Sequence, residues 1–254
     1  MPKYLFFILA ILLTVNCNSN KKAPPKPTDR TTQKADSTQV ELRKIQNGVW
    51  IHTSYHTFKG QTYPSNGMVV QVQDSLYLID PAWGEANTRI LLQKIESQIG
   101  LPIVSGLATH FHGDRVAGVD ILEAKGIEMY THPKTPALAK AEGNAVPDHT
   151  LATLNKPGAT VSFGPLEVFY PGPAHSLDNI MVWVPKQQIL YGGCAIRNAQ
   201  VTTLGNTADA DLSSWPKAIR RAQKAYPQAN IVVPGHGAVG GPELLDHTLA
   251  LFKK

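Results

Sequence analysis

Short stretches of alternating apolar and polar residues follow an apolar N-terminal run, and such alternation is typical of half-buried strands. The pattern predicts a strand over residues 48–56 and a hairpin over residues 67–83, where two apolar runs flank a Gln-Asp-Ser turn. Residues 87–100 carry apolar side chains at helical spacing and end at a glycine, so they predict a helix. A short buried strand over residues 101–109 and a helix that ends at Gly126 complete this first half.

The second half of the chain shows the same order of elements. We expect strands over residues 164–172 and 180–196, the latter a hairpin around Pro-Lys-Gln-Gln, then a helix over residues 212–228 and a buried strand over residues 229–237. Each half thus runs from a hairpin through a helix to a buried strand and a His-bearing turn. The prediction is an α/β protein, a four-layer αβ/βα sandwich of helix, sheet, sheet and helix, with its site where the strand ends converge.

The N-terminal residues are expected to lie outside this fold. Residues 1–17 are typical of a signal peptide, because Lys3 precedes an apolar run too short to span a membrane. Two alternatives stay open for the end of the run, lipidation of Cys17 as in bacterial lipoproteins, and ordinary cleavage. Residues 18–40 are polar and Pro-rich and predict a disordered tether, which leaves residues 41–254 as the folded domain. We expect a periplasmic protein, attached to the membrane in the first alternative.

The composition is that of a globular protein with a small-molecule ligand. Of the 254 residues, 43% are hydrophobic and the formal net charge is +5, with the Lys and Arg residues scattered along the chain. The lack of a basic run argues against nucleic-acid binding, whereas small anions would not be repelled. A monomer is expected. The two cysteines are Cys17 and Cys194, so the exported protein keeps one free thiol, which either lies buried and inert or binds a metal.

The stretch THFHGD places three metal-capable side chains within five positions. His110 and His112 point to the same side of an extended chain because side chains alternate with period two. Asp114 follows at the same spacing, but Gly113 allows the chain to turn and aim this carboxylate elsewhere. Imidazole nitrogen and carboxylate oxygen are both zinc ligands.

Three further candidates lie downstream, each after an apolar strand and among Gly or Pro residues. They are His175, Cys194 and His236. Together with the first motif they make a strong metal-binding pattern. The other histidines are expected to be surface or packing residues, except that one of them could touch a substrate from a loop over residues 53–66; they are His52, His56, His132, His149 and His247, and the exception is His56.

The motifs HFHGD, AHSLDN, YGGCAI and PGHG resemble those of the metallo-β-lactamases, in the subclass with a Cys in the second zinc site. The stretches YPSNG and FGPLEVFYPG are most similar to the Verona integron-encoded branch. The resemblance runs from about Val49 to the C-terminus. It implies the αβ/βα sandwich and two zinc ions. The first ion would be held by His110, His112 and His175, and the second by Asp114, Cys194 and His236.

The resemblance also implies a reaction, the opening of the β-lactam ring of penicillins, cephalosporins or carbapenems, which confers antibiotic resistance. Zinc lowers the pKa of a bound water to about 7, and the hydroxide would attack the lactam carbonyl with Asp114 orienting it. Asn206 would help to polarise the carbonyl, and Arg197 would bind the substrate carboxylate as a bidentate fork. The Verona-type enzymes carry the basic residue four positions later, where this chain has Val201.

Two supporting features are expected around this site. Residues 53–66 match a mobile flap over the site, in which Tyr55, Phe58 and Tyr63 could contact the substrate. Asp80, at the end of a strand, could accept a hydrogen bond from a ligand histidine, or could simply begin a turn with Pro81.

The sequence also leaves two alternative functions open. The first is another hydrolase of the same fold, acting on thioesters or lactones. Such enzymes usually carry a His directly after the motif Asp, where this chain has Arg115, and an Asp where it has Cys194. The second is a non-catalytic zinc-binding lipoprotein, which would not need Asn206 and Arg197 beside an open site.

Overall fold

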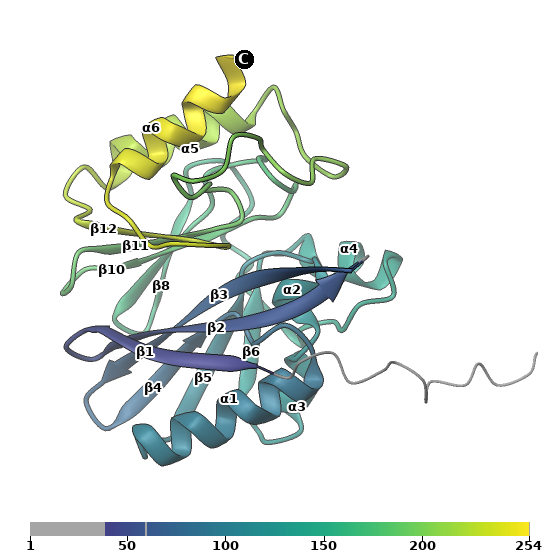
Figure 1. Ribbon diagram of the computed structural model, residues 1–254, viewed down its shortest axis with the longest axis vertical. Coiled ribbons are helices and arrows are strands. Elements are labelled where there is room, and N and C mark those ends of the chain that lie inside the picture. Colours follow the sequence, from purple (N-terminus) through teal and green to yellow (C-terminus); the bar gives the residue numbers. More distant parts are fainter. Residues whose placement is uncertain (1–38, 59, 254) are drawn as a thin grey trace, which may run out of the picture. The chain divides into compact units, whose positions relative to one another are not determined.

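The computed structural model describes residues 39–58 and 60–253, which build two facing β-sheets with helices on their outer sides (Figure 1). Because strand β1 begins at Val40, the folded domain starts one residue before its predicted boundary. The predicted signal peptide and the predicted tether up to residue 38 lie outside the described residues. No helix within residues 39–58 and 60–253 is long and apolar enough to cross a membrane.

The first sheet has seven strands in chain order, antiparallel from β1 to β4 and parallel from β4 to β7. The strands are β1 (Val40–Gln46), β2 (Val49–Phe58), β3 (Gln61–Val72), β4 (Ser75–Ile79), β5 (Ile103–Ala108), β6 (Glu128–Thr131) and β7 (His149–Thr150).

The second sheet has five strands in the order β12-β11-β10-β9-β8, and only β11 and β12 are parallel. The strands are β8 (Thr160–Phe163), β9 (Leu166–Phe169), β10 (Met181–Val184), β11 (Ile189–Gly193) and β12 (Ile231–Pro234).

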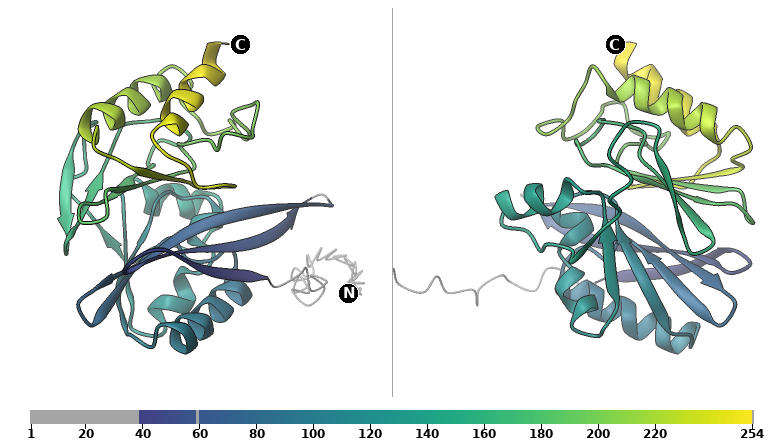
Figure 2. Two further views of the ribbon diagram at one scale, coloured as in Figure 1. Left: turned by 60° about the vertical axis from the view of Figure 1, so that its left-hand side comes forward. Right: turned by 180° about the vertical axis from the view of Figure 1, so that it is seen from behind.

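The helices form the two outer layers, with α1 and α3 below the first sheet and α5 and α6 above the second in Figure 1, and the layering is the same from behind (Figure 2). The helices of the outer layers are α1 (Glu85–Gln98), α3 (Val119–Glu123), α5 (Trp215–Ala225) and α6 (Glu243–Ala250), and the other helical segments are α2 (Gly113–Val116), α4 (Thr135–Ala141) and the 3-10 turn η2 (Leu251–Lys253).

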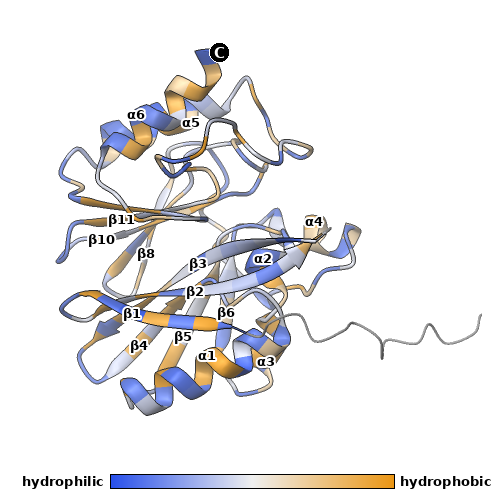
Figure 3. Cartoon of the chain, in the orientation of Figure 1, coloured by the Kyte–Doolittle hydropathy of each residue, from blue (hydrophilic) through white to orange (hydrophobic). Residues whose placement is uncertain are grey.

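Three buried apolar clusters correspond to the three interfaces between these layers. One lies between the sheets, around Val168 and Tyr191, one between the first sheet and α1, around Leu91, and one between the second sheet and α5, around Trp215. The outer helices accordingly carry both hydrophobic and hydrophilic residues (Figure 3). The predicted α/β class and the four-layer αβ/βα sandwich are therefore confirmed.

The predicted hairpins and the helix ending at Gly100 are present. Gly100 adopts a φ of 70°, and its N–H donates to the carbonyl of Ile95, which closes the end of α1. The helix expected up to Gly126 is instead split into α2 and α3. A Cβ atom at Gly118, between the two, would lie 2.0 Å from Oγ1 of Thr88, so the backbone approaches α1 more closely here than a side chain would allow.

Helix α5 is shorter than the predicted helix over residues 212–228. The Asp211 carboxylate accepts hydrogen bonds from the N–H groups of Ser213 and Ser214, so the chain turns there before the helix begins at Trp215. The helix ends before Pro227. Strands β6 and β8 and helices α4 and α6 had no counterpart in the pattern of the sequence.

The predicted loop over residues 53–66 is wrong. Residues 53–58 belong to β2 and residues 61–66 to β3, and the two strands pair from Val49 opposite Val70 to Phe58 opposite Gln61. Pro64 obscures the pattern, but it lies where β3 pairs only with β2, because β4 pairs no earlier than Met68. The flap is thus a two-stranded hairpin, joined through β3 to the rest of the first sheet.

One histidine at the base of this hairpin makes stability depend on pH. His52 is buried, its Nε2 donates to the carbonyl of Asp80, and burial lowers its pKa to about 4. A Cβ atom at Gly67 would overlap its ring, which explains the glycine. Since an unfolded His has a pKa of about 6.5, the unfolded state binds more protons between these values.

We therefore expect the free energy of unfolding to fall as the pH drops from about 6.5 to 4, by roughly 2 kcal/mol from His52 between pH 7 and pH 5. Urea titrations at the two pH values measure the difference. His52→Gln should be less stable at pH 7 and should show a smaller loss on acidification than the wild type. An equal loss in both proteins would contradict this role of His52.

Candidate metal centre

All six predicted metal ligands lie at strand ends on one edge of the sandwich. His110 and His112 follow β5, and Asp114 lies in the first turn of α2. His175 comes from the turn after β9, Cys194 directly follows β11, and His236 directly follows β12 beyond the Pro-Gly step. Three overlapping sets of ligand atoms, in each of which all atoms lie within 4.8 Å of one another, join these residues into one centre; the sets are His110, His175 and Cys194, then His110, His112 and Asp114, and then Asp114, Cys194 and His236.

Three histidine side chains converge in the first part of the centre. Nε2 of His110 lies 3.0 Å from Nδ1 of His112, and that atom lies 3.1 Å from Nε2 of His175. Burial is the main cause that holds the pKa of His110 well below its usual value and lowers that of His175 to about 3. Both imidazoles are therefore neutral at pH 7, as metal ligands must be.

Asp114, Cys194 and His236 form the second part. Oδ2 of Asp114 lies 3.5 Å from Sγ of Cys194 and 3.2 Å from Nε2 of His236, and the sulfur lies 3.2 Å from the same nitrogen. Burial alone would lower the pKa of His236, but Cys194 and Asp114 raise it to about 10. The cluster therefore favours a positive charge at its centre, whether a proton or a metal ion.

Both groups fit zinc. Tetrahedral coordination at 2.0–2.1 Å sets neighbouring nitrogen ligands ~3.3 Å apart and sulfur and nitrogen ligands slightly further apart. The spacings given above for both groups lie within a few tenths of an ångström of these values, so each group needs only a small adjustment. Three imidazole nitrogens form a common zinc ligand set, and the carboxylate, thiolate and imidazole of the other group are each donors that zinc accepts.

A buried arginine supports the second group from behind. Arg115 is fully buried, and Nη2 lies 2.9 Å from Oδ2 of Asp114 and 3.0 Å from Sγ of Cys194. Burial would raise the pKa of Asp114, but Arg115 first and His236 next hold it well below its usual value. The guanidinium also donates to four other groups, Asn66 O, Gly235 O, the Tyr191 hydroxyl and the Asp80 carboxylate.

The prediction that Asp80 accepts a hydrogen bond from a ligand histidine is wrong. Its carboxylate accepts from the N–H and the hydroxyl of Thr109 and from Tyr191, besides Arg115. Thr109 directly precedes His110. Asp80 therefore fixes the backbone from which the first ligand projects, and it does so from a backbone conformation with φ of 58°.

Gly113 does not act as predicted either. It has no positive φ, and a Cβ atom there would meet only Oδ1 of Asn144, at an ordinary 3.6 Å. Asp114 leaves the extended line of the two histidines because α2 begins after His112, which is still extended, and its carboxylate stays within 4.8 Å of their nitrogens while it also reaches Cys194 and His236. The change from extended chain to helix, rather than glycine flexibility, divides HFHGD between the two groups.

Two contacts orient ligand imidazoles. Nδ1 of His236 lies within hydrogen-bond distance of the Pro64 carbonyl, so its proton resides there and Nε2 faces Asp114 and Cys194. Nε2 of His112 lies 3.0 Å from Oδ2 of Asp209, which leaves Nδ1 for the metal. Sequence reasoning missed Asp209 because no spacing relates it to His112, 97 residues away.

The two predicted substrate-binding residues, Arg197 and Asn206, both lie in the segment between β11 and α5. Arg197 is half-buried and packs against Gly205, where a Cβ atom would lie 2.9 Å from its Nη2. Burial lowers the pKa of Arg197, and its Nε has no hydrogen-bond partner among the described residues. Asn206 is exposed, and its Oδ1 accepts a hydrogen bond from the N–H of Ala208, so its side chain stabilises a local turn.

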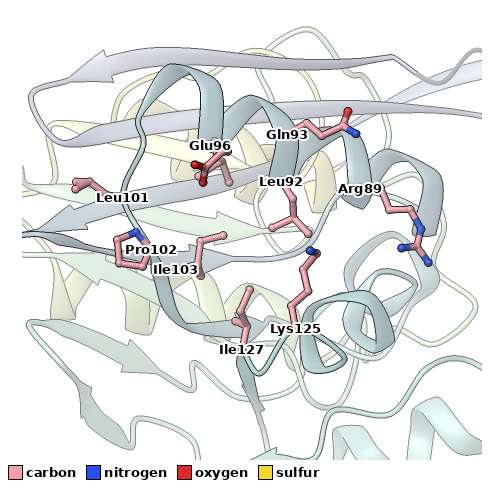
Figure 4. A pocket seen from close by; sticks show the side chains of 10 residues that line it. Arg89, Leu92, Gln93, Glu96, Leu101, Pro102, Ile103, Lys125 and Ile127 are labelled. Carbon is pink, nitrogen blue, oxygen red and sulfur yellow. The ribbon is translucent and has the colours of Figure 1, made fainter.

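The remaining histidines stay outside the ligand set, as expected. His52 and His132 are buried, His149 stacks on Tyr130, and His247 lies within hydrogen-bond distance of the Val201 carbonyl. His56 stacks on Trp83. A cavity of about 570 Å³ lies elsewhere, beside α1 and the start of β5 (Figure 4), and no residue of the metal centre lines it.

The matches to known proteins agree with this centre. The model of the metallo-β-lactamase superfamily matches residues 60–236, which include all six residues. The chain belongs to this family. A metallo-β-lactamase type 2 of Bacillus cereus is 37% identical over 87% of this chain and 85% of its own length. The type 2 enzyme of Bacteroides fragilis is 35% identical over 84% of this chain and 85% of its own length.

Solved structures of metallo-β-lactamases share the fold. The enzyme from Pontibacter korlensis is 42% identical over 85% of this chain and 100% of its own, with a TM-score of 0.79. FIM-1 from Pseudomonas aeruginosa, in a mono-zinc form, is 35% identical over 84% of this chain and 95% of its own, with a TM-score of 0.80. The predicted family is confirmed, and a special closeness to the Verona-type branch stays a prediction.

Asp209 offers a test of the first group. Asp209→Asn should weaken zinc binding there by about tenfold, since a carboxylate that accepts from a ligand imidazole orients the ring and raises its basicity. Competition with a chromophoric chelator measures the affinity. Asp120→Asn, at an exposed Asp on α3, is the matched control and should leave the affinity unchanged. Equal affinities for all three proteins would remove Asp209 from the site.

Proposed function

We propose that this protein is a zinc-dependent hydrolase that opens the β-lactam ring of penicillins, cephalosporins or carbapenems and thereby confers resistance to them. The observation that carries the proposal is the meeting of six side chains that can bind zinc. Three histidines form one group, and Asp114, Cys194 and His236 form the adjoining one. Membership of the metallo-β-lactamase family supports the reaction class, and the named relatives are enzymes of that type.

Two zinc ions would occupy the centre. His110, His112 and His175 would hold the first, and Asp114, Cys194 and His236 the second. Bound zinc supplies a water of lowered pKa as the nucleophile and a Lewis acid for the carbonyl. The protein supplies the preformed geometry, so little side-chain freedom is lost when the metal binds.

Asp114 would orient the attacking water. Its pKa is held well below the usual value, so the carboxylate is ionised at pH 7 and can only accept hydrogen bonds. Its Oδ2 already faces Arg115, Cys194 and His236. No serine nucleophile is required by this arrangement, and no acyl-enzyme is expected.

Arg197 would bind the carboxylate of the β-lactam nucleus. The described residues offer no carboxylate in an ion pair with its guanidinium, which is half-buried and lies close enough to Cys194 to feel its charge. A cation that burial destabilises gains most from an anionic ligand. Asn206 lies in the segment between Gly205, which contacts Arg197, and Asp209, which contacts His112, and would assist in polarising the lactam carbonyl.

Nitrocefin tests the function directly. The zinc-loaded protein should hydrolyse it, EDTA should abolish hydrolysis, and zinc should restore it with a binding stoichiometry of two per chain. A carbapenem serves as second substrate. Tight zinc binding without turnover of either compound would contradict the proposal and favour a non-catalytic zinc protein.

Arg197 gives a second test. Arg197→Ala should raise KM for a penicillin by about tenfold and change kcat less, because an interaction with the substrate carboxylate is made before and during the reaction. Arg197→Lys should recover part of the effect. Arg220→Ala, at an exposed arginine on α5, is the control. A fall in kcat at unchanged KM would instead place Arg197 in the transition state.

A further inference from the structure

One side of the flap hairpin faces the metal centre. Directly opposed residues of an antiparallel pair share a face, and β2 and β3 oppose Ser54 with Ser65 and His56 with Tyr63. The Ser65 hydroxyl donates to the backbone carbonyl of Asp114. His56 therefore projects from the same side of the hairpin as the residue that touches the ligand motif.

The ring of His56 is held against a tryptophan next to the second ligand group. Its centroid lies 4.6 Å from that of Trp83, with 23° between the planes. Trp83 in turn lies 6.3 Å from His236, at 63°. Trp83 is itself fixed, because its backbone N–H donates to Oγ of Ser54 and its backbone carbonyl accepts from the side-chain amide of Asn87. Trp83 thus holds the imidazole of His56 in place beside the second ligand group.

The nitrogens of this ring have no partner within the described chain. His56 is half-buried and makes no hydrogen bond or ion pair to residues 39–58 or 60–253. By contrast, His52, His236 and His247 each use a ring nitrogen on a backbone carbonyl. A fixed imidazole whose N–H has no partner in the described chain can donate a hydrogen bond to a ligand.

We propose that His56 is a specificity-determining residue that binds the side-chain substituent of the substrate and favours β-lactams whose substituent carries a carboxylate. This inference rests on the proposed function. With the carboxylate of the nucleus held at Arg197, the acylamino substituent is the part of the molecule free to reach the flap. An N–H donor gains more from a carboxylate than from an apolar group, since hydrogen bonds to charged acceptors are the stronger ones.

Carbenicillin and benzylpenicillin form a suitable substrate pair because they differ only by a carboxylate on the side chain. His56→Phe should keep the stack on Trp83 but lose the donor, and should lower the ratio of kcat/KM for carbenicillin over benzylpenicillin by about fivefold. His56→Gln, which keeps an N–H donor, should recover part of the ratio. An unchanged ratio in His56→Phe would overturn the inference.

His149→Phe is the matched control. His149 also stacks on an aromatic ring, Tyr130, at 4.9 Å and 24°, but it lies in β7 and belongs to no ligand group. This variant should retain the wild-type ratio. A similar fall in both Phe variants would show a general effect of losing an imidazole and would also overturn the inference.

A binding measurement separates this inference from the proposed function. The Cε1–H resonance of His56, assigned from its absence in His56→Phe, should shift when hydrolysed carbenicillin is added and shift less with hydrolysed benzylpenicillin. Equal shifts, or none, would contradict a role for His56. If the wild type hydrolyses no β-lactam, the proposed function fails, whereas the NMR comparison still decides whether His56 selects the carboxylate.

Discussion

The burial of the Arg115 guanidinium is the constraint on which the metal centre depends. A fully buried cation is stable only when its charge is paired, and removal of one partner leaves an uncompensated charge. Here Asp80 and Asp114 pair the charge, and backbone carbonyls of Asn66 and Gly235 accept from Nη1 and Nη2, whereas Nε has no hydrogen-bond partner among the described residues. Nη2 of the same guanidinium also holds Asp114 and Cys194 in place. The geometry of the second ligand group therefore depends on the hydrogen bonds that stabilise the buried cation.

The acceptors of Arg115 come from both sheets, so its hydrogen bonds hold the two halves of the centre together. Asn66 lies in β3, Asp80 follows β4, Tyr191 lies in β11, and Gly235 follows β12. The carboxamide of Asn66 also donates to the carbonyls of Pro234 and Gly237. The strand ends of the two half-domains are thus connected beside the ligands, and an ion that binds there meets side chains whose ordering is already part of folding.

That the six candidate ligands come together could be predicted because they occur at strand ends, next to turn residues that are visible in the sequence. Supporting contacts depend on tertiary approach and leave no such pattern. Asp209 reaches His112 only because the segment after Gly205 folds back over the first group. In the sequence, Arg115 was informative only because hydrolases with other substrates usually carry a His at this position. Its burial explains the residue better, because an imidazole could not donate hydrogen bonds to six acceptors. Residues 53–66 were misread because Gly60 and Pro64 interrupt a strand pattern that pairing with β2 restores.

That misreading bears on how the protein would select substrates. A loose loop would adapt to many side chains, whereas β2 and β3 are joined to the core by Ser54, by Ser65 and by the contact between Pro64 and His236. The base of the flap therefore presents fixed groups to a ligand. A fixed donor discriminates between substrates better than a mobile one, because no conformational entropy is lost in ordering it when the ligand binds. His56 lies in this fixed part, on the side of Trp83, while the exposed Phe58 lies beyond it near the turn. Selection by hydrogen bonding and apolar adaptation would then be functions of different parts of one hairpin.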